Sequence, residues 1–318
     1  MRILVTGANG FLGSHIIDKS LSKGHETYAL VRKGSDTSNL SHLRGFKAVV
    51  IDYSNIDSIL KILNELPKFD LFIHNAGLVK SYTFDGYKKV NIDLTEKITQ
   101  AIKKCIHYNE NLKFAYVSSL AALGPIGNGG PASNYGRSKL MAEGIVTRSG
   151  LNYNIFRPTG IYGTRDVQFV PLIKAVKKGI YPLMTSRHHK MTLINAQDVA
   201  ENILECSIQH SKEIIHLEDG HVYEHKDLKA ILESILNKKT FNLKVSKPIV
   251  KMALLLSDIF DRNLGRTPTL SREHYSEISQ DWNYDFSEER KIIPLQINYS
   301  IEKGFREAIE YYRANNLI

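Results

Sequence analysis

The stretch Thr6-Gly7-Ala8-Asn9-Gly10-Phe11-Leu12-Gly13 decides the fold, because its three glycines follow a strand-like run and open a helix-like one. In that position Gly7 permits a tight turn, Gly10 lets the backbone approach a pyrophosphate, and Gly13 lets helix and strand pack closely. The amino end of the helix adds N–H donors and positive potential. The turn therefore predicts dinucleotide binding, and the alternative is a helix start that is merely rich in glycine. We expect the contacts to come from Gly7, Asn9, Gly10, Phe11, Leu12 and Gly13.

Outward from this turn, apolar runs of strand length alternate with helical patterns through the first half of the chain. The expected strands are residues 2–6, 26–31, 47–51, 69–74, 113–118 and 153–157, and the expected helices are about 11–23, 56–66, 84–107 and 135–148. Parallel strands need long connections that pack back onto the sheet. The pattern therefore predicts an α/β fold with a doubly wound parallel Rossmann sheet.

The pattern loosens after Pro158, where glycines and prolines interrupt short segments. We expect residues 1–160 to form the dinucleotide-binding domain, with 191–217 returning to it through a strand at 213–217. Residues 161–190 and 218–318 are then a smaller, mostly helical substrate-binding lobe, closed by an amphipathic helix at 301–313.

Composition narrows the class of protein. The 318 residues are 42% apolar and 24% charged, which is typical of a globular protein and excludes a fibre or a disordered tail. The net charge of +9 is compatible with a nucleic acid, an anionic surface or a phosphorylated ligand. We expect no nucleic-acid partner, because the basic residues are scattered and form no arginine-rich arm.

Location and metal content follow from a few local features. No signal-peptide pattern precedes the first strand, so a cytoplasmic protein is expected. We expect no membrane partner, because the apolar run 249–260 is interrupted by Lys251 and Asp258 and is shorter than the roughly 20 residues of a span. Cys105 and Cys206 lack metal-ligand spacing and are expected to be reduced, structural thiols, with no metal site.

Cofactor choice depends on the end of the second strand. Arg32 and Lys33 stand where NAD-binding folds usually have an acidic residue for the ribose hydroxyls. Because Arg32, helped by Lys33, can pair with a 2′-phosphate, we expect NADP(H) in preference to NAD(H); alternatively, Arg32 only covers the adenine. At the end of the third strand we expect cofactor contacts from Asp52 and Tyr53. Asp52 is placed to receive the adenine amino group, or else it caps the following helix.

Tyr135 and Lys139 are four residues apart at the start of an expected helix, so they share one face. The ordinary pKa of tyrosine is about 10, and a neighbouring ammonium lowers it. Tyr135 can then exchange a proton with a substrate oxygen. Ser119 ends a strand at the sheet's carboxyl edge and can hydrogen-bond a reacting carbonyl. The alternative is an exposed helix with a cation beside an aromatic ring.

Several motifs together resemble the extended short-chain dehydrogenases/reductases, the NAD(P)-dependent epimerase/dehydratase-like superfamily. They are TGANGFLG at 6–13, HNAG at 74–77, the serine pair at 118–119, YGRSK at 135–139 and RPTGIYG at 157–163. The closing segment, with WNYD at 282–285, also resembles that family. The pattern is most similar to the branch that holds dihydroflavonol reductases and 3β-hydroxysteroid dehydrogenases.

The resemblance implies roles for these residues. Tyr135 is the acid/base, Lys139 lowers its pKa and binds the nicotinamide ribose, and Ser119 orients the carbonyl, with Ser118 as the neighbouring alternative. Further cofactor contacts are implied for Ala76, Gly77, Asn91, Ser118, Tyr135, Lys139 and Pro158. The ordinary alternatives are that Asn91 caps a turn and that Pro158 only ends a strand.

The leading hypothesis is an oxidoreductase that moves hydride between nicotinamide and a ketone or secondary alcohol. Apolar residues at 120–123 and 252–256 suit an apolar substrate, and the alternative, favoured for 252–256, is that they only pack in the core and between helices. Dehydration is not expected, because Ser119 is not followed by the Asp-Glu pair of the family's dehydratases. The glycine-rich interval 124–131 predicts a small, mobile lid.

Two other functions remain open. One is a nucleotide-sugar epimerase with a retained cofactor, whose diphosphate would meet cations of the lobe (Arg165, Lys174, Arg187 and Lys190). The other is a non-catalytic cofactor sensor, which has no need of Ser119, Tyr135 and Lys139 together. A homodimer through helices 84–107 and 135–148 is a further possibility.

Overall fold

The structure is a computed structural model that describes residues 1–127, 129–183, 190–246, 248–250, 252, 254–255, 275 and 279–318. Its centre is a seven-stranded parallel sheet in the order β10-β6-β5-β4-β1-β2-β3. The strands are β1 (Arg2–Thr6), β2 (Glu26–Val31), β3 (Lys47–Val50), β4 (Leu71–His74), β5 (Lys113–Val117), β6 (Asn152–Pro158) and β10 (Glu213–Leu217). The predicted parallel Rossmann sheet is confirmed, and the strand at 213–217 does join it beside β6.

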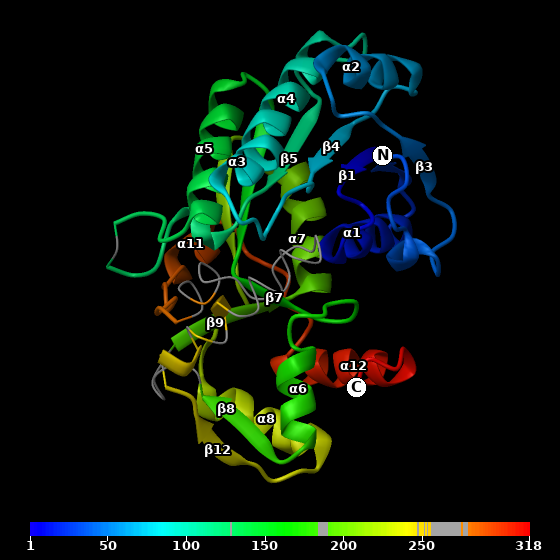
Figure 1. Cartoon of the computed structure of the whole chain (residues 1–318). Coiled ribbons are helices and arrows are strands. Elements are labelled where there is room, and N and C mark those ends of the chain that lie inside the picture. The colour runs from blue at the N-terminus through cyan, green and yellow to red at the C-terminus, as the bar shows by residue number, and fades with distance from the viewer. Residues whose placement is uncertain are drawn as a thin grey trace.

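Helices cover both faces of this sheet (Figure 1). One face carries α1 (Phe11–Ser22) and α7 (Ala196–Gln209), whose Ile16 and Val199 share a core with Val5 and Ile73 of the sheet. The other carries α2 (Ile56–Glu65), α4 (Leu94–Lys104) and α5 (Asn134–Arg148) over a second core. Strands covered on both faces are continuous apolar runs, which is why the sequence pattern located them.

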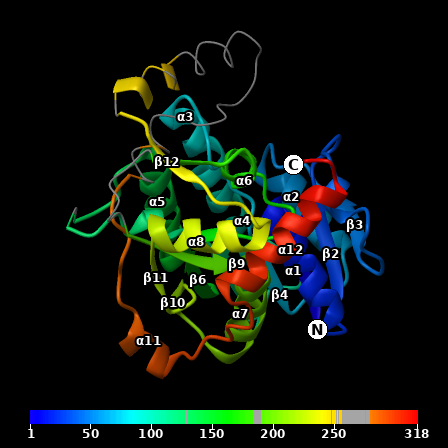
Figure 2. The ribbon, with the colours of Figure 1, turned by 90° about the horizontal axis from the view of Figure 1, so that it is seen from below.

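A smaller part lies below the sheet in Figure 1, and Figure 2 shows it from beneath. It has a three-stranded sheet of β7 (Gly160–Tyr162), β9 (Lys190–Asn195) and β11 (Val222–Glu224), and a pair formed by β8 (Ile180–Leu183) and β12 (Phe241–Lys244). Its helices among the described residues include α6 (Val170–Lys177), α8 (His225–Leu236) and α12 (Ile301–Ala314), whereas α11 (Ser287–Ile292) lies against β10 of the central sheet. Tyr162 stacks on Phe305 at 4.7 Å in its core, which joins β7 to the closing helix.

Three details differ from the sequence pattern. The lobe contains short strands that periodicity did not predict, because β12 is exposed along its whole length and β8 contains Pro182. Strand β9 pairs with β7 and β11 and not with the central sheet. The expected helix 84–107 is divided into α3 (Phe84–Tyr87), a π-helix (Lys88–Asp93) and α4, and the backbone leaves the helix at Cys105.

Two smaller expectations concern cysteines and membranes. Cys105 and Cys206 are buried and free, and burial raises the pKa of the Cys206 thiol to about 11, as expected for unreactive thiols. Among the helices of the described ranges, none is long and apolar enough to cross a membrane. Most of the apolar run 249–260 lies outside the described residues.

Candidate active site

The glycine turn lies at the point where the strand order reverses. From β1 the chain proceeds to β2 and β3 on one side, and from β4 to β5 and β6 on the other, so the carboxyl ends of β1 and β4 border a crevice. Gly7 has a φ of +62°, and a Cβ there would lie 2.8 Å from the Cα of Ala76. The turn after β1 and the loop after β4 therefore touch at this crevice, and only glycine fits between them.

The amino end of α1 is open to an anion. Its first amides have no acceptor within the helix, Gly10 provides no side-chain cap, and its first turn has no acidic residue. A Cβ on Gly13 would overlap the carbonyl oxygen of Gly7, so the turn must pack against the helix without side chains. This cradle fits a pyrophosphate group.

The other residues of the turn contribute differently. Asn9 donates from Nδ2 to the Asp36 carbonyl at 2.7 Å and thereby joins the turn to the loop after β2. Leu12 is buried in the sheet core, so only its backbone is available to a ligand. The Phe11 ring meets His15 edge to face at 5.6 Å.

The end of β2, where the sequence predicts the adenosine ribose, carries exposed cations. Arg32 and Lys33 follow β2, are exposed, and within the described ranges their side chains make no hydrogen bond or ion pair. Asp52 accepts from the amide and hydroxyl of Ser54 at 2.9 and 2.7 Å, which lowers its pKa. The cap of α2 is Asn55, so the alternative that Asp52 caps this helix is wrong. The Tyr53 hydroxyl is buried with no hydrogen-bond partner among the described residues.

Lys139 is the buried cation of the site. Its Nζ donates to the Val117 carbonyl at 2.7 Å and lies 3.5 Å from the Tyr116 hydroxyl. Burial lowers the pKa of Lys139 to about 8, although the charge of Glu143 opposes that shift. A Cβ on Gly77 would lie 3.3 Å from Nζ, so the ammonium is beside the loop that follows β4.

Tyr135 is half-buried in the first turn of α5, which is packed against the turn Leu120–Ala122. A Cβ on Gly136 would overlap the Ala121 carbonyl, so this packing requires glycine. Ser119 precedes the same turn, and its hydroxyl accepts from the Ala121 amide at 3.2 Å. The hydroxyl proton of Ser119 is then available for a carbonyl oxygen. The fold therefore places Ser119 and Tyr135 on two segments in direct contact.

Asn91 supports the loop after β4. Its side chain accepts from the Leu78 amide at 2.7 Å and donates to the Leu78 carbonyl at 3.0 Å and to Ser138 at 2.8 Å. It lies in the π-helix, an irregularity often found at functional sites. Its side chain holds the segment after Ala76 and Gly77 against α5.

A buried chain of polar groups behind this loop was not identified from the sequence. His74 lies between Thr6 at 2.9 Å and Thr95 at 3.0 Å, and Thr95 donates to the Asn91 carbonyl at 2.7 Å. Burial and the charge of Lys139 lower the pKa of His74 to about 3, so it is neutral. The only sequence signal is that His74 and Thr6 each end a strand.

Two predicted residues lie at the carboxyl ends of β5 and β6. Ser118 is buried and donates to Glu143 at 2.5 Å, so its hydroxyl is a poor alternative to that of Ser119. Pro158 is the last residue of β6 and pairs with Leu217, a position that fits both the cofactor contact and the strand-end alternative. The neighbouring Thr159 hydroxyl, which the sequence did not single out, is buried with no hydrogen-bond partner among the described residues.

The cations suggested for a diphosphate differ in burial and in their partners. Arg165 is buried against α1, where its Nη2 lies 2.9 Å from His15 and 3.3 Å from Asp18. Lys174 and Lys190 are exposed, and Arg187 lies outside the described residues. Nη2 of Arg165 therefore ties the loop after β7 to the glycine-turn helix, whereas its Nη1 is buried with no hydrogen-bond partner among the described residues.

The glycine-rich interval is tied to the closing segment of the chain. Tyr284 donates from its hydroxyl to the Gly124 carbonyl at 2.9 Å, and the Ile126 amide donates to the Asp281 carbonyl at 3.3 Å. These bonds connect the segment beside Ser119 to the smaller lobe.

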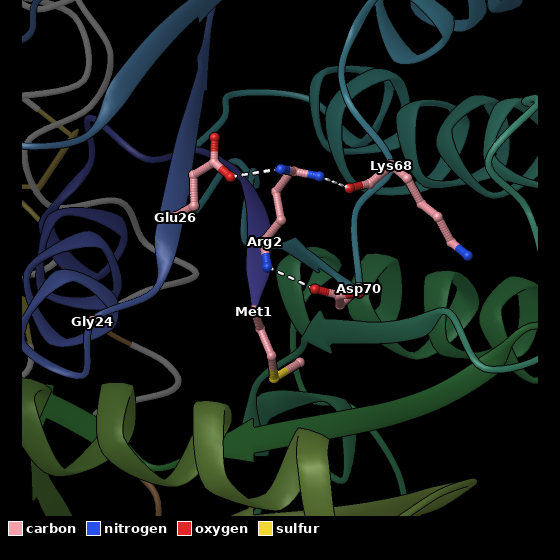
Figure 3. A pocket seen from close by; sticks show the side chains of 6 residues that line it. All are labelled: Met1, Arg2, Gly24, Glu26, Lys68 and Asp70. Atoms are coloured by element: carbon pink, nitrogen blue, oxygen red, sulfur yellow. Dashed lines mark hydrogen bonds and ion pairs between the residues drawn. The ribbon is translucent and has the colours of Figure 1, made fainter.

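A pocket of about 480 Å³ lies at the opposite edge of the sheet (Figure 3). It is lined at the amino ends of β1 and β2, where Arg2 binds Glu26 at 2.8 Å and its amide donates to Asp70 at 2.7 Å. Arg2 and Glu26 form an ion pair there, and the proposed catalytic residues are at the carboxyl edge of the sheet.

Comparison with known proteins agrees with this geometry. The family model described as "NAD dependent epimerase/dehydratase family" matches residues 3–220. The ceramide reductase of Caulobacter vibrioides is 25% identical, over 98% of this chain and 94% of its own. The decarboxylating sterol-4-alpha-carboxylate 3-dehydrogenase of Dictyostelium discoideum is 23% identical, over 70% and 73%.

Among solved structures, the UDP-glucose 4-epimerase of Thermotoga maritima with UDP-glucose superimposes with a TM-score of 0.78 at 18% identity, over 99% of this chain and 100% of its own. That likeness shows the fold. Since the family model covers more than half of the residues, the chain belongs to the NAD-dependent epimerase/dehydratase family, as its motifs predicted.

Proposed function

We propose that this protein is an NADP(H)-dependent reductase of an apolar ketone, or the dehydrogenase of the corresponding secondary alcohol. The observation that carries the proposal is the buried ammonium of Lys139, on one face of α5 with Tyr135 and beside Ser119. A bound nicotinamide cofactor supplies or accepts the hydride at such a site. Tyr135 then donates a proton to the carbonyl oxygen, or removes it in the reverse direction.

Each of the three side chains has a separate task. The positive charge of Lys139 favours the phenolate of Tyr135 and thus brings its proton within reach of the reaction. Ser119 donates to the carbonyl oxygen and orients it. The glycine turn binds the pyrophosphate, and Lys139 also binds the nicotinamide ribose.

Preference for NADP(H) rests on Arg32 and Lys33. Both are exposed where a 2′-phosphate would lie, and they stand at the position where NAD-binding folds usually have an acidic residue. An arginine forms paired, charge-assisted hydrogen bonds with phosphate. Asp52 and Tyr53 would border the adenine.

The class of substrate is inferred from two sources. The apolar turn Leu120–Ala122 is next to Ser119, and one relative that matches over nearly its full length is named a ceramide reductase, while another relative is named a sterol-4-alpha-carboxylate 3-dehydrogenase. We propose that residues 161–190 and 218–318 form the lobe that receives this substrate.

The second candidate is a nucleotide-sugar epimerase, because a UDP-glucose 4-epimerase has the same fold. The internal pairing of Arg165 with His15 and Asp18 counts against a diphosphate site there. Turnover decides between them: a reductase consumes reduced cofactor in proportion to product, whereas an epimerase consumes none. Assays with long-chain ketones and with nucleotide sugars, both followed by nicotinamide absorbance, test the proposal.

A further inference from the structure

Consecutive residues at the carboxyl end of β5 bind two side chains on successive turns of α5. The Val117 carbonyl accepts from Lys139 at 2.7 Å, and the Ser118 hydroxyl donates to Glu143 at 2.5 Å. Ser119 comes next and carries the hydroxyl assigned to the carbonyl. Any shift of this strand end would therefore move the hydroxyl and the ammonium together.

Glu143 is fixed in turn by Arg157 of the adjacent strand β6. Nε and Nη2 of Arg157 donate to the two carboxylate oxygens at 2.9 and 2.6 Å, and the two side chains are 10% and 4% exposed. Arg157 Nη1 lies 3.4 Å from His216, whose other ring nitrogen lies 2.6 Å from Glu289 of α11. A buried ion pair stabilises a fold little more than apolar packing would, so this one calls for another role.

We propose that Glu143 and Arg157 are positioning residues, which hold the reacting end of β5 and the ammonium of Lys139 in place for proton transfer. The inference rests on the proposed function of Ser119, Tyr135 and Lys139. Arg157 holds the Glu143 carboxylate in place, and the carboxylate holds the Ser118 hydroxyl. Because Val117, Ser118 and Ser119 are consecutive, this also fixes the Ser119 hydroxyl and the Val117 carbonyl that binds the Lys139 ammonium.

The pair also acts on the charge of Lys139. The titratable groups that face this ammonium are Glu143 from α5, Tyr116 from β5 and His74 from β4. Tyr135 of α5 acts on Tyr116. Burial leaves His74 neutral and raises the pKa of Tyr116 well above its usual value. Glu143 is therefore the group that favours the charged form of Lys139. Around Glu143 itself stand Arg157, His216 and Glu289.

Glu143→Gln tests the electrostatic part, since it keeps the size of the side chain and one acceptor oxygen but removes the charge. Without that charge Lys139 loses its proton more easily. The alkaline limb of the kcat profile is expected to move to lower pH by roughly half a unit to one unit. The pH at which binding of the reduced cofactor weakens, followed by its fluorescence, should move in the same direction, and this readout needs no substrate.

Glu201→Gln is the matched control. Glu201 is also a buried carboxylate, but its partners are Lys19 and Lys23 at 2.9 and 2.5 Å, in the contact between α7 and α1. This variant is expected to lower the melting temperature and to leave both pH profiles unmoved. Ser118→Ala tests the mechanical part: it keeps every charge and is expected to lower kcat about tenfold with the alkaline limb in place.

The possible results separate this inference from the proposed function. If Glu143→Gln behaves like Glu201→Gln, with lower stability and unmoved profiles, the pair is only structural and the inference is overturned. If Glu143→Gln does not fold, an unchanged kcat in Ser118→Ala overturns it instead. A shifted cofactor-binding profile in a protein that reduces no carbonyl would support the positioning of Lys139 and contradict the proposed function.

Discussion

The ammonium of Lys139 lies 2.7 Å from the carbonyl oxygen of Val117, with burial that lowers the pKa of Lys139 to about 8. A lysine held this way is charged at neutral pH and loses its charge within the range of ordinary assays. Strand β5 thus fixes the position of the group that is proposed to act on Tyr135.

The first prediction concerns the pH dependence of turnover. Lys139 is protonated below its pKa, so reduction should be constant near pH 7 and fall above about pH 8, the value to which burial lowers this group. Lys139→Met should remove this limb and lower kcat by about 10²-fold or more, the usual contribution of acid–base assistance. Steady-state rates from pH 6 to about 10 in one buffer series check it; a wild-type rate that rises steadily through pH 9 would be inconsistent with the role given to Lys139.

The second prediction concerns the glycine turn. A Cβ on Gly13 would overlap the Gly7 carbonyl, so Gly13→Ala should force the turn away from α1. We expect cofactor affinity to fall at least tenfold and the free energy of unfolding to fall by about 1–3 kcal/mol, the usual range for overpacking. Gly130→Ala is the control, because a Cβ there meets nothing within 4 Å. Equal cofactor affinities in the two variants would contradict the proposal that the glycine turn binds the pyrophosphate of the cofactor.

Cofactor choice gives the third prediction. Arg32→Ala removes an exposed guanidinium that has no protein partner among the described residues, so its effect on stability should be small. The dissociation constant for NADPH should rise about 10- to 100-fold, as for a lost charge-assisted hydrogen bond, and that for NADH should hardly change. Titrations of both cofactors check this, and parallel losses for the two would mean that Arg32 only covers the adenine.

The fourth prediction concerns Asp166, a buried carboxylate in the loop after β7. Its Oδ1 accepts from the Gln168 amide at 2.9 Å, but its Oδ2 has no hydrogen-bond partner among the described residues. Burial raises the pKa of Asp166 to about 6. The folded state therefore binds this proton more tightly than the unfolded chain, and stability is lost as pH rises from about 4 to about 6.

Asp166→Asn removes that loss, since the amide is neutral at every pH and its oxygen can still accept from Gln168. The free energy of unfolding should increase by roughly 3 kcal/mol at pH 7 and change little at pH 4. Urea unfolding at the two pH values measures the difference. A variant that is less stable than the wild type at pH 7 would show that the charge of Asp166 is needed in the fold.

The sequence predicted the parts of this molecule that depend on local pattern. Strands buried on both faces are apolar runs, and the glycine turn has a fixed place after the first of them, so both could be recognised. Tyr135 and Lys139 could be paired because four residues make about one helical turn. Glu143 lies four residues further along the same face of α5. Its partner Arg157 is on strand β6, so the sequence alone does not show that the two side chains meet.

What could not be predicted depends on contacts between distant segments or on weak periodicity. The chain from Thr6 through His74 to Thr95 needs β1, β4 and α4 to be assembled first. The π-helix at Lys88–Asp93 keeps an apolar period that reads as an ordinary helix. Exposed β12 has no buried face, so no alternation marks it as a strand.

The most direct test of the account is to mix the protein with NADPH and a set of apolar ketones, including long-chain ones, and to follow absorbance of the reduced nicotinamide. Loss of absorbance should equal the alcohol formed. Tyr135→Phe should bind NADPH normally and lose about 10²- to 10⁴-fold in kcat, whereas Tyr153→Phe, on β6, should retain activity. Conversion of a nucleotide sugar with no net loss of NADPH, or full reductase activity in Tyr135→Phe, would contradict it.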